Sequence, residues 1–554
     1  MDNRLDNLSK MDFLSRKFEY ALLIVILLFC GIHTTKTAMD FTITSRNLCW
    51  GIGTLVMFIM IMSRAMNGRV DLSIIKRAIF PIYAGLFLVS IFSVTQAINR
   101  GEAWYYAFRV VPEIAFLFCA TVILSENNIN VIIKFIVLLA LGLGGYGIYQ
   151  YFTIDYPAVR TGTMANMNLC STAHLLMVPF SIYAMWRYSK IWKILGTVAA
   201  AVALFIILFS LRTRSTWVAL FVMSLVATCR NKKLLLIMVL LFILAGSAIY
   251  AIRGNHIFYS ESILERLDLW SGSMKMLKDH PLGVGVGNWR ISIVPYARYM
   301  TLSDAMQKVG FCKVYFQRAH NDWVQILSEL SIPGFILYLS LFVLSLYYAI
   351  KAKSVLIYSC LTAFMVDACF SFSRERTFYV VYLLIVMAIA IILSHKLKPT
   401  YKINGTYFGS IAVMAGLSFA LVIFGIRYKT ECNVNKMIHA RQKQQWDKIL
   451  QCTERISGFS ALDSFCTPLL VYQGMANYAK RDFSRAVTDF QRAYEINPNH
   501  IQVLTQLAQC YKIHGRPDLA QEYYQKALDL FPNNPIATEG LEKIKTVAMK
   551  GTIK

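Results

Sequence analysis

Hydrophobic residues along this chain gather into long runs separated by short polar segments. A helix that crosses a bilayer needs roughly 17–25 mostly apolar residues, and about thirteen runs approach that length. The pattern therefore predicts an all-α, polytopic transmembrane helix bundle of about 12–13 spans. We expect the spans near 19–34, 48–63, 78–95, 104–124, 131–152, 170–187, 191–210, 214–229, 234–252, 333–350, 354–371, 377–394 and 407–426.

Basic residues between the runs predict the orientation of the bundle. Lys and Arg cluster after the second, sixth, eighth, tenth and twelfth runs, and such clusters collect in cytoplasmic loops. The N-terminus is then cytoplasmic. The segment 253–320, which follows the ninth run, and everything after the thirteenth run are expected on the outer side.

Composition and net charge further restrict the class of protein to which the chain can belong. Of 554 residues, 56% are hydrophobic and 16% are charged, against roughly 25% charged in a soluble domain. These values exclude disorder, a collagen-like repeat and a small disulfide scaffold. The net charge of +25 belongs to cytoplasmic loops, so nucleic acid is not an expected partner. The 12 Cys are scattered without zinc-ligand spacing, so we expect no metal site and no cofactor.

A repeat begins where the apolar runs end. From 431 onward the sequence is of a soluble, helix-forming type with a period of 34 residues: Gly474, Ala486, Phe490, Ala493 and Pro498 recur as Ala508, Ala520, Tyr524, Ala527 and Pro532. This pattern resembles the tetratricopeptide repeat. We therefore predict a transmembrane catalytic domain over 1–430 and a helical repeat domain over 431–554. Segments 436–456 and 535–547 are expected to complete the stack, because two repeats alone are too few.

Charged residues at the outer ends of spans are costly and therefore mark candidate sites. Arg212 and Arg214 lie in the turn between the seventh and eighth spans, and Arg266 and Asp268 lie in the outer loop. The two arginines of the turn either bind an anionic ligand or anchor a span at lipid headgroups.

Two further segments of the outer loop carry polar and glycine-rich sequence. Residues 280–290 read His-Pro-Leu-Gly-Val-Gly-Val-Gly-Asn-Trp-Arg, and residues 318–329 read Arg-Ala-His-Asn-Asp-Trp-Val-Gln-Ile-Leu-Ser-Glu. The glycines either need unusual dihedral angles or approach a nucleotide, although no strand precedes them. His320 is either an interfacial histidine or a catalytic base.

In combination these segments resemble the O-antigen ligase and polymerase superfamily of bacterial cell-envelope glycosyltransferases. The sequence Arg-Thr-Gly-Thr-Met-Ala-Asn-Met-Asn at 160–168 belongs to the same resemblance, which covers roughly 19–395. Ser331 departs from it at a position where the family usually has Gly, and Asp322 replaces a commonly apolar residue.

The resemblance implies an inverting, metal-independent transfer of a glycan from an undecaprenyl-diphosphate carrier to an acceptor hydroxyl at the periplasmic face of the bacterial inner membrane. A lipid A core acceptor would make the chain an O-antigen ligase of lipopolysaccharide biosynthesis, which is our leading interpretation. A growing glycan would make it a polymerase, and a protein acceptor an O-oligosaccharyltransferase. The periplasmic repeats are expected to recruit a protein partner.

The residue types suit this chemistry. Guanidinium groups bind phosphate oxygens bidentately, so we expect the donor diphosphate to lie against arginines. Neutral imidazole is a suitable base for a hydroxyl, so His320 is the expected base, with Asn321 positioning it or the donor. The expected diphosphate ligands are Arg212, Arg214 and Arg266, and the supporting residues are Arg290, Arg318, Asp268, Glu329, Asn166 and Asn168.

A lipid-linked oligosaccharide transporter is the alternative from a different class. Transporters often contain internal repeats between membrane halves, and this sequence shows none. The large outer loop rich in Arg, His and Gly favours the enzyme.

Overall fold

The computed structural model describes residues 2–67, 70, 72–126, 129–253, 261–297, 316–394, 406–454 and 456–551. Helices make up most of these residues, and no β-strand forms among them. The all-α prediction is confirmed. The expected outer loop 253–320 is covered only in part, since 254–260 and 298–315 lie outside the described residues.

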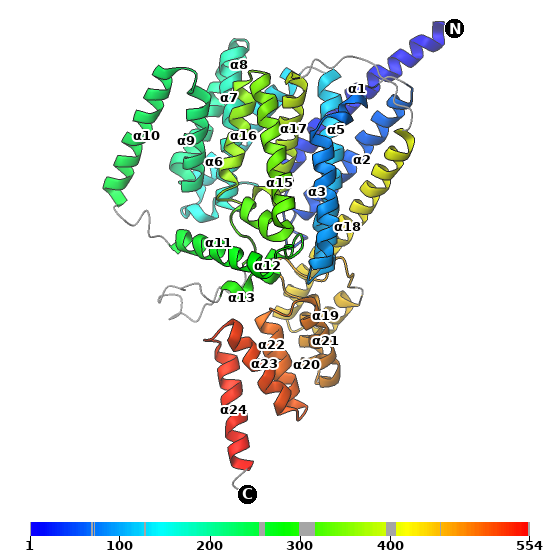
Figure 1. Cartoon of the computed structure of the whole chain (residues 1–554), viewed down its shortest axis with the longest axis vertical. Helices are drawn as coiled ribbons and strands as arrows, with labels where there is room; N and C mark the ends of the chain where they lie inside the picture. Colours follow the sequence, from blue (N-terminus) through cyan, green and yellow to red (C-terminus); the bar gives the residue numbers. More distant parts are fainter. Residues whose placement is uncertain are drawn as a thin grey trace.

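A bundle of long helices forms the larger part of the molecule (Figure 1). Its principal helices are α1 (Asp2–Ile32), α2 (Thr44–Met66), α3 (Ile79–Ser93), α5 (Val110–Glu126), α6 (Ile129–Thr153), α7 (Met167–Arg187), α8 (Lys190–Phe205), α9 (Arg214–Thr228), α10 (Lys232–Arg253), α15 (Asp322–Lys351), α16 (Val355–Asp367), α17 (Thr377–Ser394) and α18 (Thr406–Gln442). Each expected span overlaps one of them. Among the described residues, nine helices are long and apolar enough to cross a membrane, and α9 and α16 are apolar but shorter.

Shorter helical segments extend the spans or connect them. They are η1 (Leu72–Lys76), η2 (Val94–Gln96), α4 (Arg100–Phe108), η3 (Pro157–Val159), the π-helical η4 (Ile206–Leu211) and η6 (Ser373–Glu375).

Helix α17 lies at the centre of the bundle and packs against α5, α15 and α16. Its aromatic residues Phe378, Tyr379 and Tyr382 are buried. The Tyr379 hydroxyl donates a hydrogen bond to the Leu169 carbonyl at 2.5 Å, and the Tyr382 hydroxyl donates to the Leu176 carbonyl. Both acceptors belong to α7, so the polar ends of central aromatic residues are satisfied within the bundle, as an apolar environment requires.

One end of the bundle is covered by α11 (Glu261–Asp279), α12 (Trp289–Ser292) and α13 (Val294–Ala297). In Figure 1, α11 lies across the bundle rather than along it. It buries Leu269 and Met276 against Trp289 and Ile293, and the Trp289 indole donates to the Ser273 hydroxyl at 2.9 Å. The polar face of α11 is thereby left at the surface, so the helix caps the end of the bundle.

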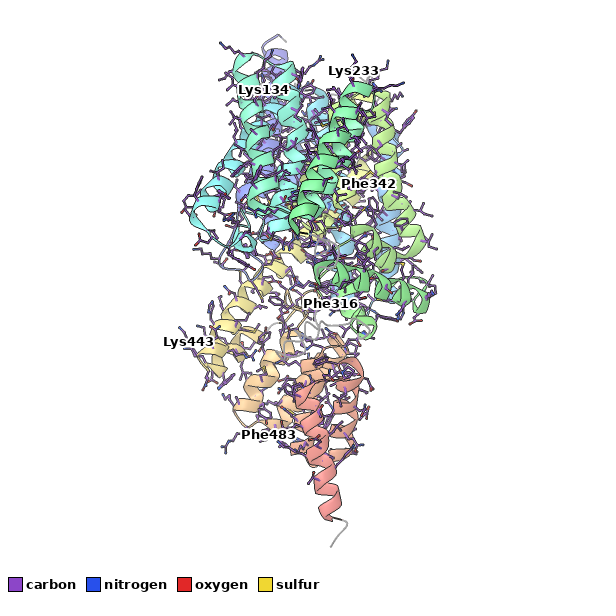
Figure 2. The ribbon with its side chains drawn as sticks, turned by 90° about the vertical axis from the view of Figure 1, so that its left-hand side faces the viewer. Lys134, Lys233, Phe316, Phe342, Lys443 and Phe483 are labelled. Atoms are coloured by element: carbon purple, nitrogen blue, oxygen red, sulfur yellow. The ribbon has the colours of Figure 1, made fainter. Side chains whose placement is uncertain are left out.

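The repeat region continues from the same end of the bundle (Figures 1 and 2). Helix α18 is continuous for 37 residues and runs from the bundle into this region. The expected domain boundary at 430 falls within that helix, and the division stays a prediction. The helices that follow are α19 (Trp446–Thr453), α20 (Leu469–Ala479), α21 (Phe483–Ile496), α22 (Ile501–Ile513), α23 (Pro517–Leu530) and α24 (Pro535–Gly551).

Small residues allow the repeat helices to approach one another closely. A Cβ atom on Gly474 would lie 2.9 Å from the Phe490 ring, and one on Gly540 would lie 2.4 Å from the Tyr524 ring. Ala486 and Ala520 are fully buried. The periodic positions read from the sequence therefore form the helix contacts, which confirms the tetratricopeptide-like prediction.

A buried ion cluster joins the repeat side to the bundle. Glu102 of α4 is fully buried and pairs with Arg290 of α12 at 2.5 Å and with Arg427 of α18. Arg427 also pairs with Glu431 at 3.4 Å, and Glu431 accepts a hydrogen bond from Ser464 at 2.9 Å. We call Glu102, Arg290 and Arg427 the Glu102 cluster. It connects three elements that are far apart in the sequence.

Candidate functional site

The glycine-rich segment forms a tight loop beneath the start of α15. Gly283, Gly285 and Gly287 have φ angles of +84°, +87° and +75°, which favour glycine. A Cβ atom would lie 2.5 Å from the Glu329 carbonyl oxygen at Gly283 and 2.2 Å from the Tyr106 ring at Gly287. The structure therefore supports the reading in which these glycines meet a demand for unusual dihedral angles and close packing.

Ser331 lies at a break inside α15. Its φ of +59° and ψ of −169° belong to a region that is almost confined to glycine. The Ser331 hydroxyl donates a hydrogen bond to the Pro281 carbonyl at 2.5 Å. The residue that departs from the family pattern thus keeps a glycine-like conformation and ties α15 to the glycine-rich loop.

His320 lies immediately before α15, and the start of that helix fixes its position. The Asn321 side-chain oxygen accepts hydrogen bonds from the backbone N–H groups of Trp323 at 3.0 Å and Val324 at 3.1 Å. Asn321 is therefore the N-cap of α15. His320 has a positive φ of 53°, and its half-buried ring lies edge-on to Phe372 with 5.3 Å between ring centroids.

Two guanidinium groups lie against the same phenylalanine ring. Arg376 is 5.3 Å and Arg318 is 5.9 Å from the Phe372 centroid, within the range of a cation–π interaction. Arg376 also donates to the Thr42 hydroxyl at 3.1 Å. We call His320, Arg318, Arg376 and Phe372 the Phe372 cluster. It brings the expected base together with one buried cation, Arg318, and one half-buried cation, Arg376.

Arg214 and Arg266 come from different elements and interact electrostatically. Arg214 is the first residue of α9, and Arg266 lies on α11. Burial lowers the pKa of Arg266, the charge of Arg214 lowers it further, and Glu265 and Asp367 raise it. Two of the three expected diphosphate ligands therefore lie near enough at the covered end of the bundle for the charge of one to act on the other.

Asp367 connects this arginine pair to the Phe372 cluster. Its two carboxylate oxygens accept hydrogen bonds from the Thr172 hydroxyl at 2.7 Å and the Ser373 hydroxyl at 2.8 Å, and its charge acts on Arg266. Ser373 is the neighbour of Phe372 in the chain. The carboxylate thus contacts the segment that holds Phe372, and its charge also acts on Arg266.

The expected supporting arginines have carboxylate partners already. Arg290 pairs with Glu102, and Arg318 pairs with Glu375. Burial alone would lower the pKa of Arg318, but the charge of Glu375 raises it above its usual value. These guanidinium groups act first as parts of a buried network.

Glu329 belongs to the same network. The Gln325 amide donates to Glu375 at 2.6 Å and to Glu329 at 3.2 Å. Glu329 therefore supports the start of α15 from inside the bundle.

The remaining expected residues lie around this arrangement. Asn166 caps α7 by accepting from the Asn168 backbone at 2.8 Å. Arg212 is exposed in a left-handed conformation with φ of +54°, and its Nε donates to the Phe209 carbonyl at 3.0 Å. Asp268 lies half-buried on α11, where burial raises its pKa. Arg212 thus closes the end of η4, and among the described residues no hydrogen bond or ion pair joins it to Arg266.

Residues 162–339 match the family model described as O-antigen ligase, and residues 468–533 match the tetratricopeptide repeat. The chain is therefore similar to the O-antigen ligase family over residues 162–339, which we call the ligase region, and to tetratricopeptide repeats farther along. Both resemblances are thereby confirmed. The ligase region supports a membrane glycosyltransferase of the O-antigen ligase or polymerase type, and it contains every candidate residue from Asn166 to Glu329.

No curated protein matches the chain. A solved structure titled "Crystal structure of APC/C hetero-tetramer Cut9-Hcn1" aligns with 90% of this chain and 92% of its own at 12% identity. Its TM-score of 0.21 is too low to bear on the fold.

Four residues close to the candidate site were not predicted from the sequence: Arg46, Asp367, Glu375 and Arg376. They lie outside residues 162–339 of the chain. The signal for two of them was present, because Arg374-Glu375-Arg376 is a charged turn between two apolar runs, like the turn of Arg212 and Arg214. Asp367 ends an apolar run and gives no such signal. Arg46 lies near the start of α2, where its guanidinium donates to the His33 carbonyl at 2.8 Å.

Proposed function

We propose that this protein transfers a glycan from an undecaprenyl-diphosphate carrier to an acceptor hydroxyl by an inverting mechanism that needs no metal ion. The observation that carries the proposal is the contact between α11, which carries Arg266, and the segment that carries His320. Trp270 of α11 donates a hydrogen bond to the Ala319 carbonyl at 2.9 Å, and the charge of Arg214 acts on Arg266. The family match over 162–339 supports the proposal.

The arginine pair would bind the leaving group. Departure of a lipid diphosphate places negative charge on phosphate oxygens, and two fixed guanidinium groups stabilise that charge as it develops. Arg266 is held on a helix that is packed against Trp289 through Leu269, so the pair is preorganised. Arg376, which sequence reasoning missed, is a further candidate for this role because its guanidinium lies beside His320 across Phe372.

His320 would act as the general base. The acceptor oxygen attacks the anomeric carbon, the bond from that carbon to the diphosphate oxygen breaks, and the acceptor proton passes to a ring nitrogen of His320. The products are the glycosylated acceptor and the free lipid diphosphate. Asn321 would act through the helix it caps rather than by contact with the substrate.

We infer further that the site and the repeats face the periplasm. The N-terminus lies at the opposite end of the bundle from the repeats in Figure 1, and Lys134 and Lys233 lie at the end opposite Phe316 in Figure 2. Basic residues favour the cytoplasmic side. This arrangement supports the orientation drawn from the charges of the loops, with a catalytic region to about 430 and repeats beyond it.

The lipid A core is the acceptor that we propose first, so the protein would be an O-antigen ligase. The test is to compare surface glycans of a strain that lacks this protein with those of the parent. Loss of glycan-bearing lipopolysaccharide with accumulation of lipid-linked glycan is expected. Loss of chain length instead would indicate a polymerase, and loss of glycosylated protein an O-oligosaccharyltransferase. An unchanged profile of all three would contradict the proposal.

A further inference from the structure

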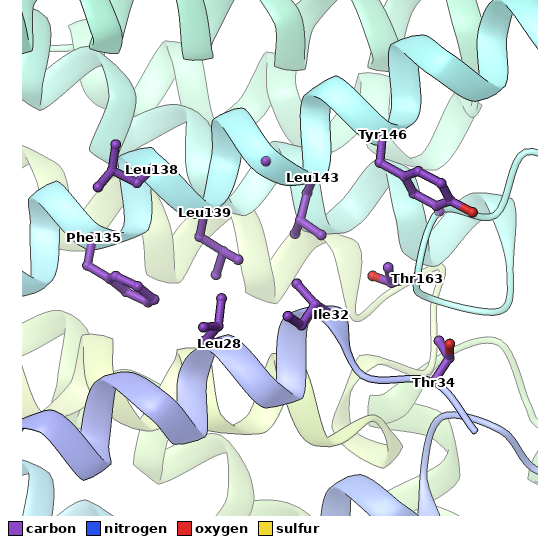
Figure 3. Close-up of a pocket in the computed structure, with 11 residues that line it drawn as sticks. Leu28, Ile32, Thr34, Phe135, Leu138, Leu139, Leu143, Tyr146 and Thr163 are labelled. Atoms are coloured by element: carbon purple, nitrogen blue, oxygen red, sulfur yellow. The ribbon is translucent and has the colours of Figure 1, made fainter.

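An apolar groove of about 550 Å³ lies between α1 and α6 (Figure 3). Leu28 and Ile32 of α1 face Leu139 and Leu143 of α6 across it. Gly142 forms part of its lining. The side chains of Leu28, Ile32 and Leu138 are 37–47% exposed, so the groove is open along the side of the bundle, where a membrane protein meets lipid.

The length of the groove fits one leaflet. Its lining on α6 extends from Phe135 to Tyr146, and eleven helical steps cover about 16 Å, roughly half of the ~30 Å hydrocarbon core of a bilayer. Figure 3 shows Thr34, Thr163 and the Tyr146 hydroxyl together at one end. A groove that is apolar over about 16 Å and polar at one end suits a single lipid chain with its headgroup at the polar end.

Hydrogen bonds fix the residues at the polar end of the groove and connect it to the candidate site. The Thr163 hydroxyl donates to the Gly31 carbonyl at 2.5 Å, and Arg46 donates to the Thr163 carbonyl at 2.6 Å. Arg46 is buried, and its charge interacts with that of Arg376 in the Phe372 cluster. The segment that carries Thr163 leads directly to Asn166 and α7. A lipid in the groove would therefore present its headgroup toward the arginines.

We propose that this groove holds the polyisoprenoid tail of the lipid-linked donor. This inference rests on the proposed function. Continuity with the arginine-lined end of the bundle favours the donor over a bulk phospholipid, because a phospholipid has no need to lie beside a base and several guanidinium groups. The tail would fix the height of the diphosphate in the membrane.

Two glycines of α6 offer a matched test. A Cβ atom at Gly142 or at Gly145 would have open space around it, and Gly142 alone of the two lines the groove. Leucine at position 142 would add its side chain to the lining of the groove, with open space for its Cβ atom, whereas leucine at 145 makes the same change of helix propensity elsewhere. Leu28→Trp would fill the groove from α1. It shows whether a loss of lipid binding depends on filling the groove or only on a change within α6.

Occupancy can be read without any transfer reaction. The full-length protein with a photoreactive phenylalanine at Leu138 is placed in phospholipid nanodiscs that contain undecaprenyl phosphate as a minor component, and the mass of the adduct is measured after irradiation. An undecaprenyl adduct enriched over phospholipid is expected. Gly142→Leu and Leu28→Trp should lower it about tenfold, since loss of contact with two methylene groups changes an equilibrium by about that factor, and Gly145→Leu should not.

The outcomes separate this inference from the proposed function. Predominantly phospholipid adducts, or equal undecaprenyl labelling in Gly142→Leu and Gly145→Leu, would overturn the groove assignment even if His320-dependent transfer stands. Undecaprenyl labelling in a protein that transfers no glycan would support the groove and count against the enzyme.

Discussion

Glu102→Gln tests whether the buried ion cluster holds the repeat side of the molecule to the site. Glu102 is fully buried, and the side chains of Arg290 and Arg427 are 5% and 7% exposed. Glutamine keeps the size of the side chain but removes the charge that two guanidinium groups share. Leaving a buried charge without its partner costs about 3–5 kcal/mol. Arg427 retains Glu431 at 3.4 Å, so most of this cost falls on Arg290 and α12.

Hydrogen exchange on the full-length protein in nanodiscs measures this effect locally. A loss of about 3–5 kcal/mol corresponds to exchange about 100-fold faster or more, confined to α4, α12 and the adjoining part of α18. Glu539→Gln is the control, because its pair with Lys543 is 60–66% exposed and a solvent-exposed ion pair adds little stability. If Glu102→Gln exchanges like Glu539→Gln, the cluster does not stabilise the junction.

Three further predictions concern the site and the repeats. Ser331→Ala should destabilise the protein by about 1–2 kcal/mol, since alanine keeps the unfavourable φ and loses the hydrogen bond to Pro281. Ser331→Gly should be close to neutral. A thermal unfolding temperature of Ser331→Ala no lower than that of Ser331→Gly would contradict this. Arg266→Lys should lower transfer because lysine cannot bind phosphate bidentately, and full activity of purified Arg266→Lys would remove Arg266 from the diphosphate site. Burial lowers the pKa of His500 to about 3, below its unfolded value of about 6.5. As pH drops below about 6.5, the unfolded chain therefore takes up a proton at His500 before the folded chain does. The free energy of unfolding of the repeats should then fall by up to about 1.4 kcal/mol per pH unit. Protection of residues 468–533 from hydrogen exchange should show this slope, and His500→Gln should reduce it; equal slopes would refute it.

The fold was largely predictable because its determinants are periodic in the sequence. Each apolar run became a helix, and the 34-residue spacing of Gly474 and Ala508 placed the repeat contacts. The continuity of α18 through residue 430 was not predictable, because a change of composition marks a change of environment and not a break in the backbone. The sequence shows that Ser331 departs from the family pattern. Its φ of +59° was not predictable, because it depends on the packing of the loop at Pro281.

The site was predictable only where charges stand out against apolar sequence. Arg214, Arg266 and His320 satisfied that condition, and the structure brings the two arginines together. The partners of buried charges were not predictable, because Glu102 and Glu375 pair with Arg290 and Arg318 across 188 and 57 positions of the chain. Tertiary contacts of this kind leave no mark on local spacing.

His320 is proposed as the base of a glycan transfer reaction, and single-turnover transfer by purified His320→Ala is the measurement that decides this role. The assay uses full-length protein, lipid-linked glycan extracted from the deletion strain and the acceptor that the strain leaves unmodified. A general base contributes about 10²–10⁴-fold, so His320→Ala should transfer at least about a hundredfold more slowly with unchanged labelling of the groove. His280→Ala, at a histidine in the turn that follows α11, is the control and should transfer at the wild-type rate. Transfer by His320→Ala at the rate of His280→Ala would contradict the account.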